Sequence, residues 1–407
     1  MGLLVQKYGG SSVATPALIQ RVAQRVVAAR RAGHDLVVVV SAMGKTTDNL
    51  IGLAEEITDY PGDREMDMLL SSGERVSMAL LSMAINAMGC EAISLTGSQC
   101  GIITDTSHRK ARIMEIKGDR IFEELGKGKV VIVAGFQGVS LEREVTTLGR
   151  GGSDRTAVAL AHRLKAELCE IYTDVDGVFT ADPRIVPDAR KLDVISSDEM
   201  LELASSGAKV MEAKSVEFAN KYNVTIHVRS SFNEHSGTII KREDAMMEQV
   251  LVRGIAHELN EAKVTFRGVP DRPGVVAEIF SRLSDANVNV DMIVQNVSES
   301  GVTDVSFTVQ KVDMRTALGI CEGVKDKLQA KEVTADEEIA KVSVVGVGMR
   351  SHSGVAAKMF QALADEGINI EMISTSEIRI SCVIQSSEVE RAVRVLHRAF
   401  ELDEEAG

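Results

Sequence analysis

The feature that most constrains the fold of this chain is an alternation of short apolar runs with helical patterns over residues 1–230. The apolar runs cover residues 3–5, 36–40, 92–95, 130–134, 168–172 and 224–228. Continuous apolar runs of this length are typical of strands buried on both faces, and helical stretches between such strands indicate a mostly parallel sheet. The sequence therefore predicts an α/β domain with a central sheet between layers of helices.

Polar or glycine-rich residues follow the first five of these runs. They occupy residues 7–12, 41–44, 96–98, 135–138 and 173–177. The carboxyl ends of parallel strands share one edge of a sheet, where open α/β sheets bind their ligands. We therefore expect these loops to meet at one site.

The first of these loops has the residues of a phosphate-binding loop. Lys7 precedes the adjacent glycines Gly9 and Gly10, and Ser11 follows them. Glycines let backbone N–H groups approach an anion, the serine adds a hydroxyl donor, and the lysine adds a positive charge. A helix should follow Thr15, a good N-cap. The spacing matches neither the Walker pattern nor GxGxxG, so the usual P-loop and dinucleotide sites are excluded.

A second glycine-rich stretch, residues 146–154, precedes a helix predicted over 156–164. Its glycines free backbone N–H groups at a helix N-terminus, where anions bind favourably. Arg150 can hold a carboxylate through two hydrogen bonds, and Asp154 adds a carboxylate to the first turn. This stretch therefore suits an anionic substrate.

Three other positions carry charge that fits the same chemistry. Glu74 follows a glycine in a helical stretch and could bind an ammonium group, whereas Lys209 follows a glycine at a predicted helix start and could reach a phosphate. Residues 172–184 are acidic but lack the spacing and closing glutamate of an EF-hand, so a nucleotide pocket suits them better than a calcium loop.

The composition excludes several classes of protein. A net charge of −13 argues against a nucleic-acid or anionic-membrane partner, because either requires a basic face. The five cysteines have no CxxC spacing and the eight histidines do not cluster, so we expect reduced thiols and no resident metal site. Residues 1–6 lack the features of a secretory signal, and no run of 18 apolar residues occurs. We expect a cytoplasmic protein.

The C-terminal part of the chain contains an internal repeat. Residues 274–293 share nine identities in twenty positions with residues 354–373. Each copy has the pattern strand, glycine turn, helix, strand, strand, helix, which predicts a βαββαβ unit with two helices on one face of a four-stranded sheet. We therefore expect a catalytic α/β domain over 1–230, a linker with the first regulatory strand over 231–263, and two repeats over 264–335 and 336–407.

Taken together and in this order, the motifs resemble those of aspartokinase, an enzyme of the amino-acid kinase fold. The stretches that carry the resemblance are Lys7–Ser12, the Ser41 loop, Ser72–Arg75, Gly149–Asp154, Asp174–Gly177, Asp182–Arg184 and Gly207–Lys209. The repeat resembles the paired ferredoxin-like ACT domains of the monofunctional bacterial form. In one departure, the second repeat has Ser351 where the first has Asp271, so the two repeats need not bind effectors equally.

The resemblance implies ATP-dependent phosphorylation of the L-aspartate side chain to 4-phospho-L-aspartate, with Mg²⁺, as the first step of lysine, threonine and methionine synthesis. It makes Lys7, Asp154 and Lys209 catalytic. Its nucleotide-binding residues are Lys7, Tyr8, Gly9, Gly10, Ser11, Tyr172, Thr173, Asp174, Asp182, Arg184 and Lys209. Its aspartate-binding residues are Ser41, Thr47, Glu74, Arg150, Gly151, Gly152 and Ser153.

The same resemblance implies feedback inhibition by lysine, by threonine or by both, at sites on the two repeats. The expected effector residues are Asp271, Gly274, Val275, Asn289, Val290, Asp291 and Gln295 in the first repeat, and Val355, Ala356, Asn369, Ile370, Ser376 and Glu377 in the second. The repeats should pair, within a chain or in a homodimer or larger oligomer. Met246 or Met247 could also start a separately translated regulatory subunit.

Two alternatives remain open from the sequence. Another amino-acid kinase with a carboxylate acceptor, such as acetylglutamate kinase, would need neither Glu74 for a free ammonium group nor a tandem effector module. A non-catalytic amino-acid sensor of the same fold would not need Lys7, Asp154 and Lys209 together. The effector and the oligomeric state are left undetermined.

Overall fold

The computed structural model describes residues 2–243, 251–296, 301–350 and 352–404. Met246, Met247 and Ser351 lie outside the described residues. The chain divides into two compact units, one of residues 1–179, 191–204 and 209–247 and the other of residues 180–190, 205–208 and 248–407. Each unit is described by itself.

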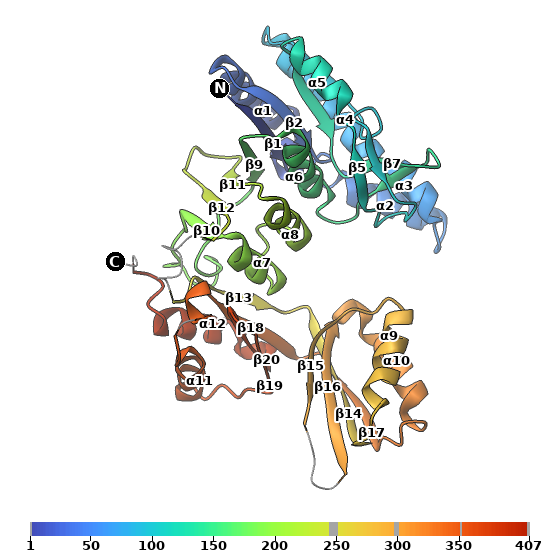
Figure 1. The fold of residues 1–407 in the computed structure, drawn as a ribbon, viewed down its shortest axis with the longest axis vertical. Helices are drawn as coiled ribbons and strands as arrows, with labels where there is room; N and C mark the ends of the chain where they lie inside the picture. The colour runs from blue at the N-terminus through green and yellow to red at the C-terminus, as the bar shows by residue number, and fades with distance from the viewer. Residues whose placement is uncertain (1, 244–250, 297–300, 351, 405–407) are drawn as a thin grey trace. The chain divides into compact units, whose positions relative to one another are not determined.

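The first unit is built on an eight-stranded sheet with the order β10-β12-β11-β9-β1-β2-β6-β3 (Figure 1). Its strands are β1 (Leu3–Tyr8), β2 (Asp35–Val40), β3 (Ala92–Leu95), β6 (Val130–Ala134), β9 (Leu168–Thr173), β10 (Val194–Ser196), β11 (Ile226–Ser230) and β12 (Thr238–Lys241). All neighbouring pairs are parallel except β11 with β12. The predicted mostly parallel sheet is confirmed, and each of the six predicted runs contributes a strand.

Helices pack on both faces of this sheet. The helices of the unit are α1 (Pro16–Arg31), α2 (Thr46–Ile57), α3 (Asp63–Leu70), α4 (Ser72–Ala87), α5 (Asp119–Gly126), α6 (Gly152–Leu164), α7 (Ser197–Ser205) and α8 (Ala213–Tyr222). One core joins α1 and α4 to the alternate strand residues that include Tyr8, Leu36 and Val38. Helix α6 packs on β1, β2 and β9 and against α8. As predicted, Thr15 caps α1, accepting a hydrogen bond from Leu18 N–H at 3.3 Å.

A second, mixed sheet with the order β5-β4-β7-β8 was not predicted. Its strands are β4 (Ile102–Thr104), β5 (Ile113–Ile116), β7 (Gln137–Ser140) and β8 (Val145–Thr147). The stretch Asp63–Ala87, which spans α3 and α4, is long and apolar enough to cross a membrane, but 50% of its most apolar window is buried inside the unit. Half-burial of this kind is typical of a core helix.

Both repeats in the second unit form four-stranded sheets with two helices. The first has β14 (Glu261–Pro270), α9 (Val275–Asp285), β15 (Val290–Gln295), β16 (Val302–Gln310), α10 (Met314–Lys325) and β17 (Glu332–Asp336), in the order β15-β16-β14-β17. The second has β18 (Ile339–Val345), α11 (Val355–Asp365), β19 (Met372–Thr375), β20 (Arg379–Gln385) and α12 (Val389–Ala399). Its fourth strand, β13 (Gly254–Glu258), pairs antiparallel with β18.

The fourth strand of the second repeat therefore comes from the expected linker, ahead of the first repeat. This earlier segment pairs along β18 and covers its edge. The linker also contains β12, which belongs to the catalytic sheet, so that sheet extends beyond residue 230. In the sequence, the first repeat is therefore inserted between two strands of the second, β13 and β18.

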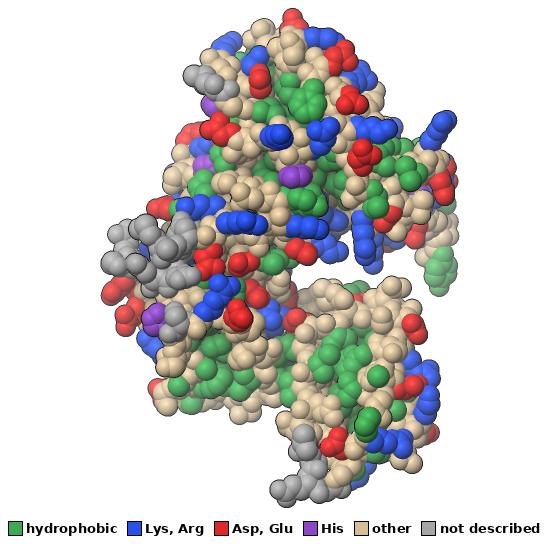
Figure 2. All heavy atoms as spheres, in the orientation of Figure 1, with side chains coloured by type: hydrophobic (Ala, Val, Ile, Leu, Met, Phe, Trp, Pro, Cys, Tyr) green, Lys and Arg blue, Asp and Glu red, His purple; other side chains and the backbone are tan. Residues whose placement is uncertain are grey.

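Figure 2 shows that basic and acidic side chains are interspersed on the visible face of the molecule. Mixed charge of this kind provides no broad basic surface on that face, which agrees with the net charge of −13.

Candidate active site

A cavity of about 940 Å³ in the first unit brings together most of the predicted catalytic and aspartate-binding residues. The predicted residues that line it are Lys7, Gly9, Gly10, Ser41, Thr47, Glu74, Arg150, Gly151, Gly152, Ser153 and Asp154. They come from the loops after β1 and β2, from α2 and α4, and from the start of α6. Residues far apart in the sequence thus share one wall because parallel strands end at one edge of the sheet.

Lys7 and Asp154 form an ion pair at this cavity, with 2.6 Å between Lys7 Nζ and Asp154 Oδ1. Successive side chains of a strand point to opposite faces, so Lys7 faces α6 whereas its neighbour Tyr8 faces the core of α1 and α4. Asp154 lies in the first turn of α6. The pair leaves the lysine 11% exposed, so its ammonium group is held in place beside the cavity.

Neither glycine after Lys7 has a left-handed backbone, and only Gly10 is required for close approach. Gly9 has a φ of −70°, and its N–H donates to Tyr172 O at 3.2 Å, so this donor is already used by the sheet. A Cβ on Gly10 would lie 2.9 Å from Ala42 O. Gly44 N–H donates to Gly10 O at 3.0 Å. Glycine at position 10 therefore lets the loops after β1 and β2 touch.

Glu74 is buried in the first turn of α4 and lines the cavity. Its Oε1 accepts a hydrogen bond from Ala42 N–H at 3.1 Å, while its Oε2 has no hydrogen-bond partner among the described residues. Burial raises the pKa of Glu74 to about 7, against the opposing effect of the backbone hydrogen bond from Ala42. A buried carboxylate oxygen without a donor from the described chain can accept one from a ligand, and an ammonium group would supply it.

The loop before α6 depends on left-handed glycines. Gly149 and Gly151 have φ values of 77° and 71°. Helix α6 begins at Gly152, four residues before the predicted start at residue 156. The glycines turn the chain at the start of α6, where Gly152 N–H and Asp154 N–H donate to Gly149 O and Gly151 O at 2.9 and 3.1 Å. Arg150 and Ser153 belong to the cavity lining.

The structure places several predicted nucleotide residues outside the lining of this cavity. The side chains of Tyr8 and Tyr172 are buried and stacked, with 4.7 Å between ring centroids, so their rings are not available to a nucleotide. Ser11 is exposed in a short 3-10 helix, Gly10–Val13. Thr173 ends β9 and Asp174 follows it, and Thr173 donates to the Asp174 carboxylate at 3.1 Å.

Asp182, Arg184 and Lys209 are also not brought to the cavity. Arg184 donates to Asp182 through Nη2 at 2.7 Å, and these hydrogen bonds hold the pKa of Asp182 below its usual range. This pair belongs to the second unit. Lys209 is exposed in a turn, and the helix expected to start there begins only at Ala213, after the Glu212 cap.

The sequence analysis missed one wall of the cavity. His108, Arg109 and Lys110 line it, together with Asp63. Three consecutive basic residues after an apolar segment were the available indication, but they match no phosphate or carboxylate motif.

The predicted effector residues have mixed environments in the second unit. Gly274 and Gly354, with φ values of 95° and 101°, precede α9 and α11 as matched left-handed caps. Val275 and Val355 are buried core residues, so their side chains are unavailable to an effector. The exposed members are Asp271, Gly274, Asn289, Asp291, Gln295, Asn369, Ser376 and Glu377, whereas Val290, Ala356 and Ile370 are half-buried.

Asp291 takes part in a charge cluster between the repeats. It pairs with Lys341, which is 1% exposed and also pairs with Glu261 at 2.5 Å. Lys263 likewise pairs with Glu371 of the other repeat. The charge of Asp291 is therefore already matched within the chain, which makes it a structural element of the seam between the repeats.

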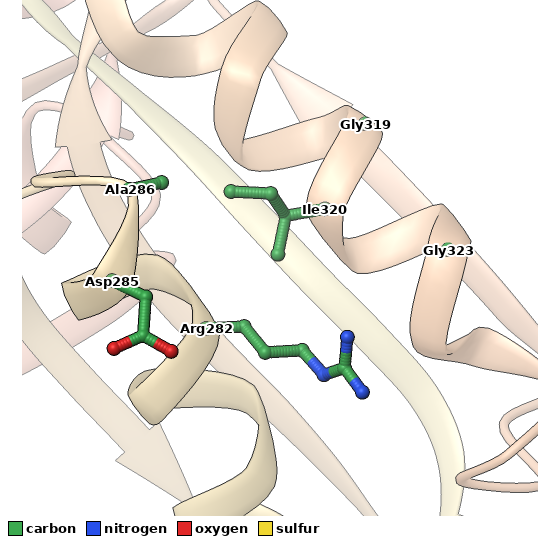
Figure 3. A pocket seen from close by; sticks show the side chains of 6 residues that line it. All are labelled: Arg282, Asp285, Ala286, Gly319, Ile320 and Gly323. Atoms are coloured by element: carbon green, nitrogen blue, oxygen red, sulfur yellow. The ribbon is translucent and has the colours of Figure 1, made fainter.

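A second hollow, of about 420 Å³, lies between α9 and α10 (Figure 3). It is lined by Arg282, Asp285, Ala286, Gly319, Ile320 and Gly323. The Arg282 guanidinium pairs with Glu278 at 2.9 Å. No predicted effector residue lines this hollow.

The sheet, the cavity and the repeated C-terminal units define an amino acid kinase joined to ACT domains. Residues 2–230 match the amino acid kinase family, and residues 264–323 and 342–400 match the ACT domain. The aspartokinase of Pseudomonas aeruginosa is 55% identical over 405 residues, which cover 99% of this chain and 98% of that protein. The chain belongs to the aspartokinase family and is an aspartate kinase.

Solved structures agree with this assignment. Escherichia coli aspartokinase III in complex with aspartate and ADP, in the R-state, has a TM-score of 0.83 at 26% identity and covers 98% of this chain and 99% of its own. The same enzyme in complex with lysine and aspartate, in the T-state, has a TM-score of 0.77 at 27% identity and covers 98% of this chain and 99% of its own.

Proposed function

We propose that this aspartate kinase transfers the γ-phosphoryl group of ATP to the side-chain carboxylate of L-aspartate, giving 4-phospho-L-aspartate for lysine, threonine and methionine synthesis. The observation that carries the proposal is one cavity that holds the Lys7–Asp154 pair and the unpartnered Glu74 carboxylate oxygen. The first can meet a phosphoryl group, and the second can meet the ammonium group of a free amino acid.

The chemistry needs no strong base at the acceptor. A side-chain carboxylate with an ordinary pKa of about 3.9 is already ionised at neutral pH. The barrier comes from bringing an anionic nucleophile to an anionic phosphoryl group, so charge neutralisation and positioning do the catalytic work. Lys7 supplies that charge, and Asp154 fixes the position of its ammonium group.

The substrate then has a defined orientation. Glu74 binds the α-ammonium group, and Arg150 binds the α-carboxylate from the start of α6. Ser41, Thr47 and Ser153 supply hydroxyl donors to the same pocket. This arrangement points the side-chain carboxylate toward Lys7, where the phosphoryl group is expected.

Magnesium fits this site as an ion carried by the nucleotide. The described residues contain no group of three or more His, Cys, Asp or Glu side chains that could hold a metal, whereas Mg²⁺ commonly binds through substrate phosphates with one or two carboxylates. When bound, it would neutralise charge on the phosphates. Asp154 is the carboxylate at the Lys7 end of the cavity that could contribute a ligand.

We also propose that the ACT domains bind lysine, threonine or both as feedback inhibitors. The support is the pair of matched glycine caps with exposed polar residues beside them, and the structural relative that was solved with lysine. Pairing of ACT domains between chains would give the homodimer or larger oligomer expected from the repeat.

The catalytic proposal is tested by mixing the enzyme with ATP, magnesium and one acceptor at a time. Hydroxylamine converts an acyl phosphate to a hydroxamate, which is then identified by mass. We expect the β-hydroxamate of aspartate from L-aspartate and no product from N-acetylglutamate. Product from N-acetylglutamate alone would instead support the acetylglutamate kinase alternative.

A further inference from the structure

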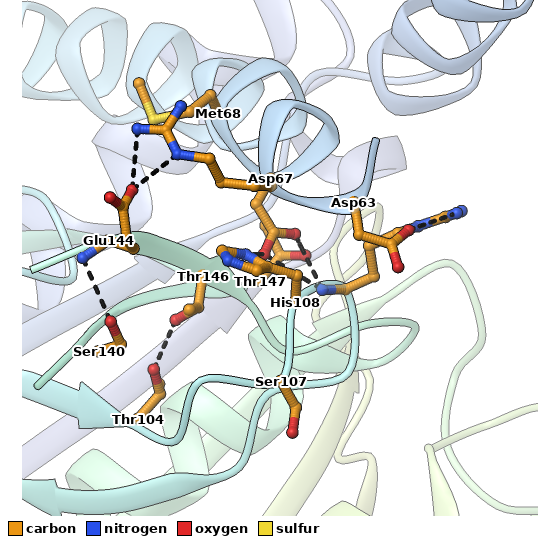
Figure 4. Close-up of polar contacts among 12 residues, drawn as sticks. Asp63, Asp67, Met68, Thr104, Ser107, His108, Ser140, Glu144, Thr146 and Thr147 are labelled. Carbon is orange, nitrogen blue, oxygen red and sulfur yellow. Dashed lines mark hydrogen bonds and ion pairs between the residues drawn. The ribbon is translucent and has the colours of Figure 1, made fainter. Parts of the chain in front are cut away.

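The cavity wall missed by the sequence analysis is attached to a fully buried carboxylate. Asp67 of α3 has no exposed surface. Its Oδ2 accepts from His108 Nδ1 at 2.7 Å, both oxygens accept from Arg109 N–H at 3.1 Å, and its Oδ1 accepts from Thr147 Oγ1 at 2.5 Å (Figure 4). A carboxylate so fully hydrogen-bonded fixes the loop that contains its donors.

This loop is fixed at other points as well. Asp105 accepts from the N–H groups of Ser107 and Arg112 at 3.2 and 3.1 Å. Ala111 N–H donates to Thr147 O at 3.0 Å. Arg109 has a φ of 63°, an uncommon left-handed conformation for a residue other than glycine. The surrounding hydrogen bonds maintain this conformation, so His108 occupies a defined position at the cavity.

The orientation of the imidazole ring follows from its bond to Asp67. An ionised carboxylate only accepts hydrogen bonds, so Nδ1 carries a proton, and Nε2 lies on the side of the ring away from Asp67. His108 is one of the residues that line the cavity. In its charged form the ring forms an ion pair with Asp67 and directs Nε2–H outward.

The position of the loop indicates which substrate group it meets. A Cβ on Gly149 would lie 2.8 Å from Arg109 O, so this loop touches the residue next to Arg150. His108 therefore lies at the same end of the cavity as Arg150, the residue proposed to bind the α-carboxylate of aspartate. A second donor at this end would bind the α-carboxylate from the side opposite the Arg150 guanidinium.

We propose that His108 is a further aspartate-binding residue, that in its charged form it donates Nε2–H to the α-carboxylate of the substrate, and that Asp67 is the positioning residue that orients it. The inference rests on the proposed placement of aspartate between Glu74 and Arg150.

The test compares His108→Gln, Asp67→Asn and the double variant in steady-state assays with L-aspartate and ATP. His108→Gln should raise the KM for aspartate roughly tenfold, as expected for a hydrogen bond to a charged group, with kcat and the KM for ATP within about twofold. Asp67→Asn should raise the same KM, but it should add little in the His108→Gln background, because residues that act through one contact are not additive.

Arg112→Gln provides the matched control, since it removes an exposed charge from the same loop without touching the cavity lining. A wild-type KM for aspartate in His108→Gln, or a rise confined to the KM for ATP, would overturn the assignment. If Asp67→Asn does not fold by circular dichroism, His108→Gln alone decides. An Arg150→Lys variant in the same assay tests the placement of aspartate independently. If its KM for aspartate rises while that of His108→Gln does not, only the role of His108 is wrong; if neither rises, the placement of aspartate is wrong.

Discussion

Lys7 and Tyr8 are neighbours in β1, and their side chains lie on opposite faces of the sheet. Strand alternation places Tyr8 in a stacked pair with Tyr172 in the core and places Lys7 beside Asp154 at the cavity. At the residue scale, the chemistry of this site depends on which charged side chains are buried without a full set of hydrogen-bond partners. Glu74 is the clearest case, because one of its buried oxygens has no donor among the described residues.

Replacement of Lys7 by alanine should lower kcat by roughly 10² to 10³-fold while the KM for aspartate changes little. An interaction with charge that develops on the phosphoryl group is strongest in the transition state. Steady-state kinetics over both substrates measure this split. An unchanged kcat would remove Lys7 from the catalytic residues.

Arg150→Lys should chiefly weaken aspartate binding, since an ammonium group cannot reproduce the planar two-point contact of a guanidinium. We expect the KM for aspartate to rise about tenfold and the KM for ATP to stay within twofold. The opposite pattern would place Arg150 at the phosphate end of the cavity.

The raised pKa of Glu74 predicts a pH dependence. With a pKa of about 7 in the free enzyme, Glu74 is largely protonated at pH 6 and largely ionised at pH 8, and only the ionised form attracts an ammonium group. The kcat/KM for aspartate should therefore rise between pH 6 and 8. Glu74→Gln should lower this constant about tenfold and flatten the rise, and a profile that keeps its slope in the variant would contradict the role.

At the scale of elements, the start of α6 forms the anionic-substrate end of the cavity. Its N-terminus is turned into the wall by Gly149 and Gly151, and its first turn carries Asp154. The following hydrogen bond, from Arg155 N–H to Gly151 O at 3.2 Å, begins the regular helix. The position of this helix end thus depends on the left-handed backbone at Gly149 and Gly151, a conformation that residues with a Cβ adopt at a cost.

Gly151→Ala should destabilise the protein by about 1 to 2 kcal/mol, the order of the cost of a left-handed conformation, with an added clash. The new Cβ would lie 2.4 Å from Glu212 Cγ. Urea unfolding monitored by circular dichroism measures the change. Gly126→Ala is the control, because that glycine ends α5 in open space, and it should be neutral or slightly stabilising.

On the scale of the whole molecule, regulation requires the second unit to influence the first. The segment that contains Asp182 and Arg184 belongs to the second unit, although these residues are expected to serve the nucleotide. Within that unit, Arg394 donates to Ile185 O at 3.0 Å, and His397 of the same helix bonds Thr180 at 2.9 Å. A helix of the second ACT domain therefore holds the first residue and the middle of this segment, which spans Thr180–Arg190.

Gln295→Ala tests the effector assignment without changing the net charge. Gln295 is exposed at the end of β15. Inhibition depends on an effector that prefers one state of the enzyme, with a coupling of typically ~1 to 3 kcal/mol, so loss of a contact should abolish inhibition and spare uninhibited turnover. Activity is titrated with lysine, threonine and both, and Gln361→Ala on α11 serves as a control. Unaltered inhibition under every combination would reject this site.

The sequence alone determined what depends on local chemistry. Apolar periodicity and capping residues indicated the six sheet strands and the start of α1. The repeat indicated two βαββαβ units; the first has this order, whereas the second takes its fourth strand from β13. The motif residues from Lys7 to Asp154 identified most of the cavity lining, because strand ends in a parallel sheet have only one edge to share.

The tertiary structure decided the pairings between distant segments. It placed β13 in the second repeat, stacked Tyr8 on Tyr172, and joined Asp67 to His108. The sequence shows that a strand needs a neighbour and that a buried carboxylate needs a donor. It does not show which distant residue supplies either one. That choice depends on packing and burial over the whole domain, and neither is encoded in any one stretch of the chain.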